Sequence, residues 1–272
     1  MDARLQRRIQ RYGWDKASAD YEEHWRKQIE PAQTRLLEMA ALGTGERVLD
    51  IACGTGLITF PAAISVGVQG SVVGTDISDG MIGRGREEAA KRGLANVTFR
   101  RADAEALDFP ESSFDAAFCS LGLMYVPEPP KALRLMRHVL KAGGRMAVSV
   151  WGQRDRCGWA GIFPVVDARV KSEVCPMFFQ LGTGDNLRTA LELTGFSEIR
   201  VERLDTALDY ASEEDAIGAA FAGGPVALAY AHFDAKIREE AHAEYLGTIQ
   251  QYRRGAGYSI PGEFVVALAR KK

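Results

Sequence analysis

The sequence predicts an α/β fold built on a doubly wound, mostly parallel sheet. Short apolar runs that suit buried strands alternate with helical stretches between residues 47 and 151, the spacing typical of such a sheet. The first run ends in a glycine turn, and the second ends in an aspartate about twenty positions later, which indicates a ligand site at the carboxyl ends of parallel strands.

Composition and charge exclude several classes of function. The chain has 272 residues and a formal net charge of −2, so it is long enough for one large domain with insertions. Nucleic-acid-binding domains are strongly basic, and no apolar run here is long enough to span a membrane. We expect a small-molecule substrate, no nucleic-acid partner and no integral membrane segment, while a homodimer stays open.

Residues 1–45 are expected to form an N-terminal helical arm. Residues 5–42 have helical periodicity, and Pro31 is expected in the first turn of a second helix, where proline is favoured. Early arginines without an apolar segment argue against a secretory signal. The four cysteines are too few and too scattered for a disulfide framework, which favours a reducing cytoplasm. The arm contains a dense set of rings, which either anchor it on the core or close over a ligand: Tyr12, Trp14, Tyr21, His24 and Trp25.

Residues 47–56, R-V-L-D-I-A-C-G-T-G, indicate a buried strand followed by a turn. Gly54 and Gly56 allow the backbone to approach a ligand closely, and Asp50 adds a carboxylate. Thr59 stands where the dinucleotide fingerprint has its third glycine, and the phosphate-loop motif is absent. The expected ligand therefore carries little or no phosphate.

Residues 71–76 predict a second buried strand that ends in Asp76. One ionised carboxylate at this position can accept both hydrogen bonds of a ribose diol. The alternative is a helix cap, because a helix is expected at 79–92. For that helix we expect Asp79 as the N-cap and Gly93 as the stop.

Further strands are expected at 97–101, 114–120 and 145–151, with helices at 57–66 and 131–141. Asp103 follows the third strand and lies where ligands of open α/β sheets collect.

The alternation stops after residue 151. Helical substrate-cap insertions are expected at about 152–185 and 212–257, within a unit that spans 46–272. Between them we expect a helix at 187–194 and a strand at 199–210, and a last strand at 263–270. The first insertion is rich in rings, as small-ligand pockets are.

Four segments resemble motifs of the class I S-adenosylmethionine-dependent methyltransferases, in the same order and spacing: V-L-D-I-A-C-G-T-G, G-S-V-V-G-T-D-I-S, A-D-A-E-A-L-D-F-P-E-S-S-F-D and R-H-V-L-K-A-G-G-R. Residues 70–152 are most similar to the ubiquinone/menaquinone-biosynthesis C-methyltransferases and their small-molecule relatives. The resemblance implies a Rossmann-like, seven-stranded sheet with the last strand antiparallel, and S-adenosylmethionine as the cofactor.

The resemblance also implies a set of cofactor contacts. Asp50, Ala52 and residues 54–56 would face the methionine part, Asp76 the ribose, and Asp103 the adenine amino group. Ser120 and Leu121 would lie below the sulfonium, and Tyr21 would close over the methionine end. The full set is Tyr21, Asp50, Ala52, Gly54, Thr55, Gly56, Asp76, Ile77, Met81, Asp103, Ala104, Ser120 and Leu121.

The expected reaction is methyl transfer to a small, apolar or aromatic acceptor, with the methylated atom (O, N, C or S) left open. Quinone-pathway enzymes carry an Arg-Asn pair where this chain has Met124-Tyr125, which argues against a quinone precursor. The pocket candidates are Trp25, Tyr125, Trp159, Phe163 and Phe178.

A general base is not implied, because transfer from a sulfonium depends mainly on orientation. If the nucleophile is protonated, a base helps. His24 is then the first candidate, followed by His232 and His242, each against a surface or capping role; His138 is expected to be structural.

Two alternatives fit the same pattern. One is a binding protein that senses the cofactor without methyl transfer. The other is an arsenite-type, thiol-dependent methyltransferase that uses Cys157 and Cys175 in the first insertion. Cys53 and Cys119 suit small packed residues, no C-x-x-C pair is present, and no metal site is expected.

Overall fold

The computed structural model describes residues 3–170, 175 and 177–272. Its centre is an eight-stranded sheet in the order β3-β2-β1-β4-β5-β8-β6, with the short strand β7 paired to β8. The strands are β1 (Arg47–Ile51), β2 (Ser71–Asp76), β3 (Val97–Arg101), β4 (Phe114–Ser120), β5 (Leu140–Trp151), β6 (Phe196–Tyr210), β7 (Arg253–Arg254) and β8 (Gly257–Lys271).

The first five strands are parallel, and β8 runs antiparallel between β5 and β6. The last strand in the chain is inserted there because its middle, Phe264–Ala267, is fully buried on both faces. The predicted doubly wound α/β sheet with an antiparallel last strand is confirmed. Because β1 neighbours both β2 and β4, the strand order changes direction beside β1, and ligands collect at such a switch point.

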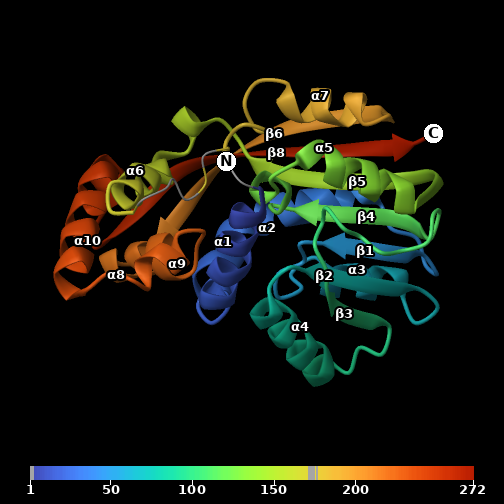
Figure 1. Ribbon diagram of the computed structural model, residues 1–272, viewed down its shortest axis with the longest axis horizontal. Coiled ribbons are helices and arrows are strands. Elements are labelled where there is room, and N and C mark those ends of the chain that lie inside the picture. Colours follow the sequence, from blue (N-terminus) through green and yellow to red (C-terminus); the bar gives the residue numbers. More distant parts are fainter. Residues whose placement is uncertain (1–2, 171–174, 176) are drawn as a thin grey trace.

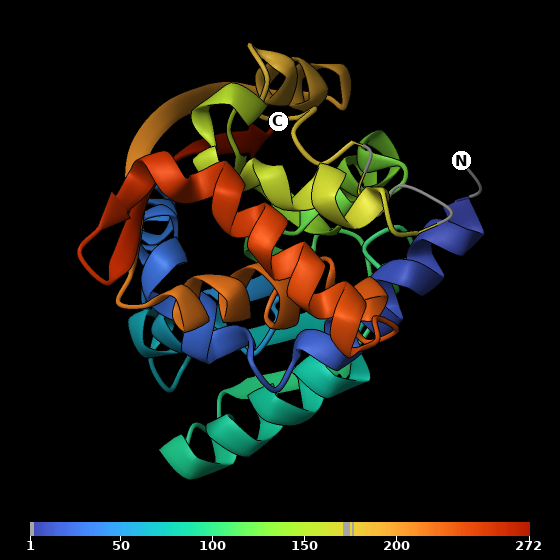
Figure 2. The same ribbon diagram turned by 90° about the vertical axis from the view of Figure 1, so that its left-hand side faces the viewer.

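The helices divide between the sheet and a cap at one end of it. They are α1 (Ala3–Ala17), α2 (Tyr21–Ala40), α3 (Thr59–Val66), α4 (Asp79–Arg92), α5 (Pro129–Val139), α6 (Ile162–Asp167), α7 (Asn186–Leu193), α8 (Glu213–Ile217), α9 (Ala227–Tyr230) and α10 (Ala235–Ile249). Figure 1 shows α6, α8, α9 and α10 beyond the end of the sheet toward which β4 points, with α1 between them and the strands. Figure 2 faces that end, where α10 crosses the front of the cap.

Shorter turns complete the cap and the strand ends. They are η1 (Leu123–Tyr125), η2 (Arg154–Arg156), η3 (Gly158–Gly161), the π-helical η4 (Gly218–Ala222) and η5 (Gln250–Tyr252). Part of the first expected insertion, residues 171–174 and 176, lies outside the described residues. No helix in the described part of the chain is both long and apolar enough to cross a membrane.

Several local predictions are wrong, among them the start of the last strand, which lies at Gly257 and not at residue 263. Pro31 lies inside α2 and does not open it; the missing N–H costs about 3 kcal/mol, which the buried face of α2 against the sheet offsets. Ser78, not Asp79, caps α4, since its Oγ accepts from the Met81 amide at 3.1 Å. The strand expected from residue 145 begins already at Leu140, with an irregular register opposite Phe114.

Candidate cofactor and acceptor site

A cavity opens at the carboxyl ends of the first four strands, beneath α1. Its wall comes from the last residues of β2 and β4, from the turns after β1, β2, β3 and β4, and from α1, α2, α4 and the η1 region. The lining consists of Arg7, Gln10, Trp14, Tyr21, Ala52, Gly54, Asp76, Ile77, Met81, Ala102, Asp103, Ala104, Ser120, Leu121, Gly122, Tyr125, Val126 and Pro127.

The loops after β1 and β4 form a strained floor. Ala52 and Leu121, which line the cavity, have φ values of 53° and 55°. Such left-handed conformations cost non-glycine residues energy and concentrate at functional sites. The loops also touch, because a Cβ on Gly122 would lie 2.4 Å from the Cβ of Ala52. The floor is therefore held in one shape by backbone packing.

Asp76 presents a fixed carboxylate at the end of β2. One oxygen accepts from the Gly54 amide and the other from the Ser78 amide, both at 2.9 Å. Burial raises the pKa of Asp76 to about 6, against the lowering effect of these backbone hydrogen bonds. Each oxygen keeps further lone pairs, so the carboxylate can accept two more hydrogen bonds from a ligand.

Asp50 lies behind the wall and is 1% exposed. Its Oδ2 accepts from the Thr59 hydroxyl at 2.6 Å, whereas its Oδ1 has no hydrogen-bond partner among the described residues. Burial raises the pKa of Asp50 to about 7; the Thr59 bond opposes this and the Asp76 charge adds to it. Two buried carboxylates therefore share this end of the sheet.

The turn after β3 adds a third acidic side chain, Asp103, to this end of the sheet. Asp103 Oδ1 accepts from the Glu105 amide at 2.9 Å. Arg7 Nε of α1 lies 2.5 Å from a Glu105 oxygen and 3.3 Å from Asp103 Oδ2. The Glu105 side chain is almost completely buried and also accepts from the Glu128 amide at 2.9 Å. Arg7 thus ties the arm to the turn beside the cavity.

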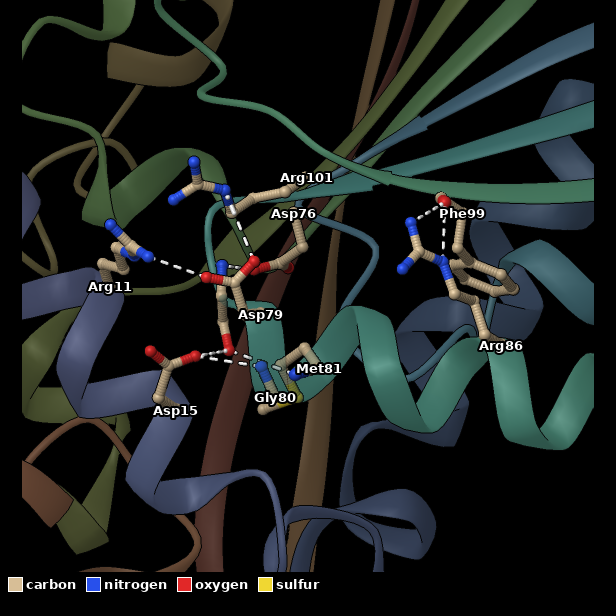
Figure 3. Close-up of polar contacts among 10 residues, drawn as sticks. Arg11, Asp15, Asp76, Asp79, Gly80, Met81, Arg86, Phe99 and Arg101 are labelled. Atoms are coloured by element: carbon tan, nitrogen blue, oxygen red, sulfur yellow. Dashed lines mark hydrogen bonds and ion pairs between the residues drawn. The ribbon is translucent and has the colours of Figure 1, made fainter.

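Two further contacts hold α1 over the strand ends, and Figure 3 shows them from α1 to the start of α4. Asp15 Oδ1 accepts from the Ser78 hydroxyl at 2.6 Å and from the Gly80 amide at 3.0 Å. Arg11 donates to Asp79 at 2.7 Å. Helix α1 therefore covers the cavity like a roof, and Arg7, Arg11 and Asp15 hold it in place.

A smaller chamber of about 30 Å³ lies further in and shares Trp14, Tyr21, Leu121 and Tyr125 with the outer cavity. We call it the inner chamber. Its remaining lining is Trp25, Ile29, Met124, Trp151, Trp159 and Pro225. This lining is apolar and aromatic, with no acidic, basic or imidazole side chain among the described residues.

Most of the expected cofactor residues line the outer cavity. Exceptions are Asp50, which lies behind it, and Thr55 and Gly56, which are absent from its described lining. Gly56 has a packing reason to be glycine, because a Cβ there would lie 2.7 Å from the Phe60 ring and its φ is +102°.

Of the pocket candidates, Trp25, Tyr125 and Trp159 line the inner chamber. Phe163 and Phe178 lie behind it; the Phe178 ring centroid is 5.3 Å from that of Tyr125 and 4.9 Å from that of Phe163. They support the chamber wall.

The histidine candidates lie elsewhere. His24 packs against Gly218 and His242 pairs with the Tyr230 hydroxyl at 3.0 Å. His232 and His138 are exposed. None of the four is in the described lining of either cavity.

Sequence reasoning missed Arg7, Gln10 and Gly122 as lining residues. Arg7, Gln10 and Trp14 are spaced i, i+3 and i+7, which places them on one helix face, and this spacing was the available signal. Gly122 carried no signal, because its close contact with Ala52 joins loops far apart in the sequence.

The cysteines do not support thiolate chemistry. Burial raises the pKa of Cys157 and of Cys175 to about 12, so both are neutral thiols at physiological pH. No group of three His, Cys, Asp or Glu side chains in the described residues could hold a metal ion. The arsenite-type alternative is therefore not favoured.

A comparison with known protein families matches the half of the chain that contains the strained residues Ala52 and Leu121. A family model described as a methyltransferase domain matches residues 42–173. This segment is a methyltransferase domain. The resemblance expected from the four motifs is confirmed, and the domain contributes Ala52, Asp76, Asp103 and Leu121 to the cavity.

Curated relatives match the same part of the chain. Aklanonic acid methyltransferase DauC of Streptomyces sp. (strain C5) is 42% identical over 134 residues, which are 49% of this chain and 61% of that protein. The ubiquinone/menaquinone biosynthesis C-methyltransferase UbiE of Yersinia enterocolitica is 45% identical over 113 residues, 41% of this chain and 45% of that protein. The matches thus span about half of each relative.

A solved structure shares the fold over most of the chain. Haemonchus contortus phosphoethanolamine N-methyltransferase 2, in complex with phosphomonomethylethanolamine and S-adenosylhomocysteine, superposes with a TM-score of 0.61 at 17% identity. The superposition covers 95% of this chain and 58% of that one. At this identity it shows the fold alone.

Proposed function

We propose that this protein transfers the methyl group of S-adenosylmethionine to a small, apolar or aromatic molecule. The observation that carries the proposal is the Asp76 carboxylate. It stands at the end of β2, next to the strand β1 beside which the strand order reverses. The Gly54 and Ser78 amides hold it there, where a ribose diol can donate to it. The methyltransferase domain supports this cofactor.

The chemistry of the lining fits the cofactor along its length. Asp76 accepts from the ribose hydroxyls, Ile77 and Met81 pack against adenine, and Asp103 accepts from its amino group. Ala52 and Gly54 leave the backbone free for the methionine part, while Ser120 and Leu121 lie toward the sulfonium and Tyr21 closes the site. When bound, the cofactor supplies an electrophilic methyl group.

A small acceptor follows from the size and chemistry of the inner chamber. Its apolar lining joins the outer cavity at the end where the residues after β4 lie. The names of DauC and UbiE also describe enzymes of small-molecule pathways. A positioned nucleophile close to the methyl group needs little more than orientation, which supplies roughly 7–11 kcal/mol of a barrier.

The decisive test replaces Asp76 by alanine. Calorimetry with S-adenosylhomocysteine should show binding to the wild type and at least a 100-fold weaker affinity for Asp76→Ala, since two charge-assisted hydrogen bonds are lost at roughly 1.5–3 kcal/mol each. Asp79→Asn is the matched control, because Asp79 follows the same strand but its side chain is 58% exposed. Its affinity should stay within about threefold of the wild type.

Turnover separates the enzyme from a cofactor sensor. The purified protein should form S-adenosylhomocysteine with at least one acceptor from a panel of phenols, enols, amines and thiols. Binding of the cofactor without product from any acceptor would favour the sensor. Equal affinity of the wild type and Asp76→Ala would overturn the assignment of the cofactor site.

A further inference from the structure

One serine joins α1 to the ribose end of the cofactor site. Ser78 follows β2 and caps α4, and its amide donates to Asp76 Oδ1 at 2.9 Å. Its hydroxyl accepts from the Met81 amide at 3.1 Å and donates to Asp15 Oδ1 of α1 at 2.6 Å. The residue that orients the Asp76 carboxylate is therefore itself held by a side chain of α1.

Gly80 gives independent evidence that α1 and this turn are fitted to each other. Its amide donates to the same Asp15 oxygen at 3.0 Å, and Figure 3 shows Asp15 reaching from α1 to the first turn of α4. A Cβ at position 80 would lie 2.7 Å from Ser18 Oγ and 3.3 Å from the Asp15 carbonyl oxygen. The end of α1 therefore comes closer to α4 than a side chain at position 80 would allow.

The face that α1 buries is polar or small. Its buried residues are Gln6, Gln10, Gly13 and Ala17. The larger apolar side chains of α1 are less covered, since Trp14 is only partly buried and Leu5 and Tyr12 are each 46% exposed. Because apolar burial is the main source of docking energy elsewhere in a fold, the docking of α1 depends more on polar contacts such as those of Asp15.

Building on the proposed cofactor site, we propose that Asp15 is a positioning residue that couples the docking of α1 to cofactor binding. Its contacts with Ser78 and Gly80 fix the turn that presents Asp76 to the ribose, and the same contacts hold α1 over the cavity. Asp15 is absent from the described lining of the cavity, so it acts through Ser78. Such coupling is reciprocal: the docked helix strengthens cofactor binding, and the bound cofactor strengthens docking by the same factor.

The charge of Asp15 gives this coupling a dependence on pH. Burial raises the pKa of Asp76 to about 6; the Ser78 and Gly54 amides lower it, and the Asp15 charge raises it. A ribose diol donates to the ionised carboxylate, so cofactor affinity should fall as pH falls below about 6. Without the Asp15 charge the Asp76 pKa is lower, and the fall in affinity should begin at a lower pH.

The other ionisable groups around Asp76 are the same with and without the Asp15 charge. Among the described residues they are Asp50, Tyr21, Cys53, Cys119, Asp79, Arg11 and Arg101. Burial raises the pKa values of the tyrosine and of both thiols, so these three stay neutral below pH 8. Asp50 titrates in the same range as Asp76, but it does so in the wild type and in every Asp15 variant.

The test compares two substitutions of Asp15 in the full chain. Asp15→Ala removes the acceptor of the Ser78 and Gly80 hydrogen bonds, whereas the amide oxygen of Asp15→Asn keeps that acceptor and only the charge is lost. Calorimetry with S-adenosylhomocysteine at pH 7.5 should show at least tenfold weaker affinity for Asp15→Ala and less than threefold for Asp15→Asn. Between pH 7.5 and 5, the affinity of Asp15→Asn should begin to fall at a lower pH than that of the wild type.

Hydrogen exchange measures the other side of the coupling. S-adenosylhomocysteine should slow the exchange of the α1 amides in the wild type, and this protection should shrink about tenfold in Asp15→Ala. Asp20→Ala is the matched control, because Asp20 follows α1 but its side chain makes no capping hydrogen bond to α2. It should keep the affinity and the protection within about twofold of the wild type.

Three results would contradict the inference. The first is equal affinity of Asp15→Ala and Asp20→Ala for S-adenosylhomocysteine, which would leave Asp15 a purely structural role. The second is an Asp15→Asn variant with the pH profile of the wild type. The third is exchange of the α1 amides in the wild type that does not respond to the ligand. Failure of the proposed function differs from all three, because then S-adenosylhomocysteine does not bind the wild type at all.

Discussion

The outer cavity and the inner chamber are built by different physical means. The outer cavity is shaped by backbone: strained residues after β1 and β4, amides that fix Asp76, and two buried carboxylates close to one end of the sheet. The inner chamber is shaped by side chains, and its rings pack edge to face at centroid distances such as 4.9 Å between Trp151 and Trp159. The first region therefore carries electrostatic and conformational strain, whereas the second is a packed set of rings in which the Trp159 N–H alone, among the described lining residues, is a buried polar group without a partner.

This difference shows how the two halves of the site are specified. The cofactor side repeats one local pattern, a strand followed by a turn, so short motifs encode it. The chamber is assembled from α1, α2, η1, β5, η3 and the residues that follow β4 and η4, which are distant in the sequence. The cofactor side should therefore respond to changes in charge and pH, whereas the chamber should respond to changes in volume.

Replacing Asp50 by asparagine should produce the largest change, and it should depend on pH. In the folded protein burial raises the Asp50 pKa from its usual 3.8 to about 7. The folded state then holds a proton that the unfolded state releases, so the stability of the wild type falls as pH rises from about 4 to 7. Asparagine cannot ionise, and the free energy of unfolding of Asp50→Asn should exceed that of the wild type by up to about 4 kcal/mol at pH 8.

Urea unfolding at pH 4, 6 and 8 measures this difference. At pH 4 both proteins hold a neutral group at this position and should unfold at similar urea concentrations. Asp185→Asn is the control, because Asp185 is exposed and makes no side-chain capping bond. If the gap between Asp50→Asn and the wild type were constant over this range, the strain on the cofactor side would not be electrostatic.

Adding one methyl group to the floor should have the next largest effect. In Gly122→Ala the new Cβ would lie 2.4 Å from Ala52 Cβ, closer than any real contact of this kind, so the loops after β1 and β4 must separate. Overpacking of this kind costs about 1–3 kcal/mol, and binding of S-adenosylhomocysteine should weaken about tenfold or more. Thermal unfolding and calorimetry measure the two effects.

Gly83→Ala provides the matched control for that variant. Gly83 lies within α4, and a Cβ there meets nothing within 4 Å. Alanine should stabilise the helix by about 0.5–1 kcal/mol and leave cofactor binding unchanged. A Gly122→Ala protein with wild-type stability and affinity would mean that the floor is compliant, and the contrast between the two regions would be lost.

The same contrast explains what the sequence could predict. Strands β2, β3 and β4 match their predicted bounds, because each is a short apolar run closed by a turn. The placement of Asp76 and Asp103 at the cavity followed from the strand ends alone. Pro31 was misplaced because tertiary packing of α2 overrides a local preference.

The acceptor side was less accessible to sequence reasoning. Trp25 and Trp159 were identified as pocket candidates by their residue type, yet only the fold shows that one N–H is bonded to Ala219 and the other is unpaired. His24 was the first candidate for a base because it lies among rings in the sequence. In the structure it turns toward Gly218 of the cap instead.

Helix α1 covers both regions, because Trp14 lines both cavities. Removing one of the contacts that hold α1 in place should give the smallest of the expected effects. Arg7 is the link that pairs with a buried carboxylate, because the side chain of its partner Glu105 is 1% exposed. Arg7→Ala should cost about 1 kcal/mol, since a partly exposed pair contributes little more. Because α1 covers the cavity, release of S-adenosylhomocysteine in stopped-flow measurements should become about fivefold faster, the factor that 1 kcal/mol permits.

Arg11→Ala is the control, because Arg11 is also in α1 but forms an exposed pair with Asp79. This variant should change the release rate less than twofold. Equal acceleration in both variants would mean that the roof responds to the loss of any positive charge. A specific effect of Arg7 would mean that the roof opens at the Arg7–Glu105 pair beside Asp103.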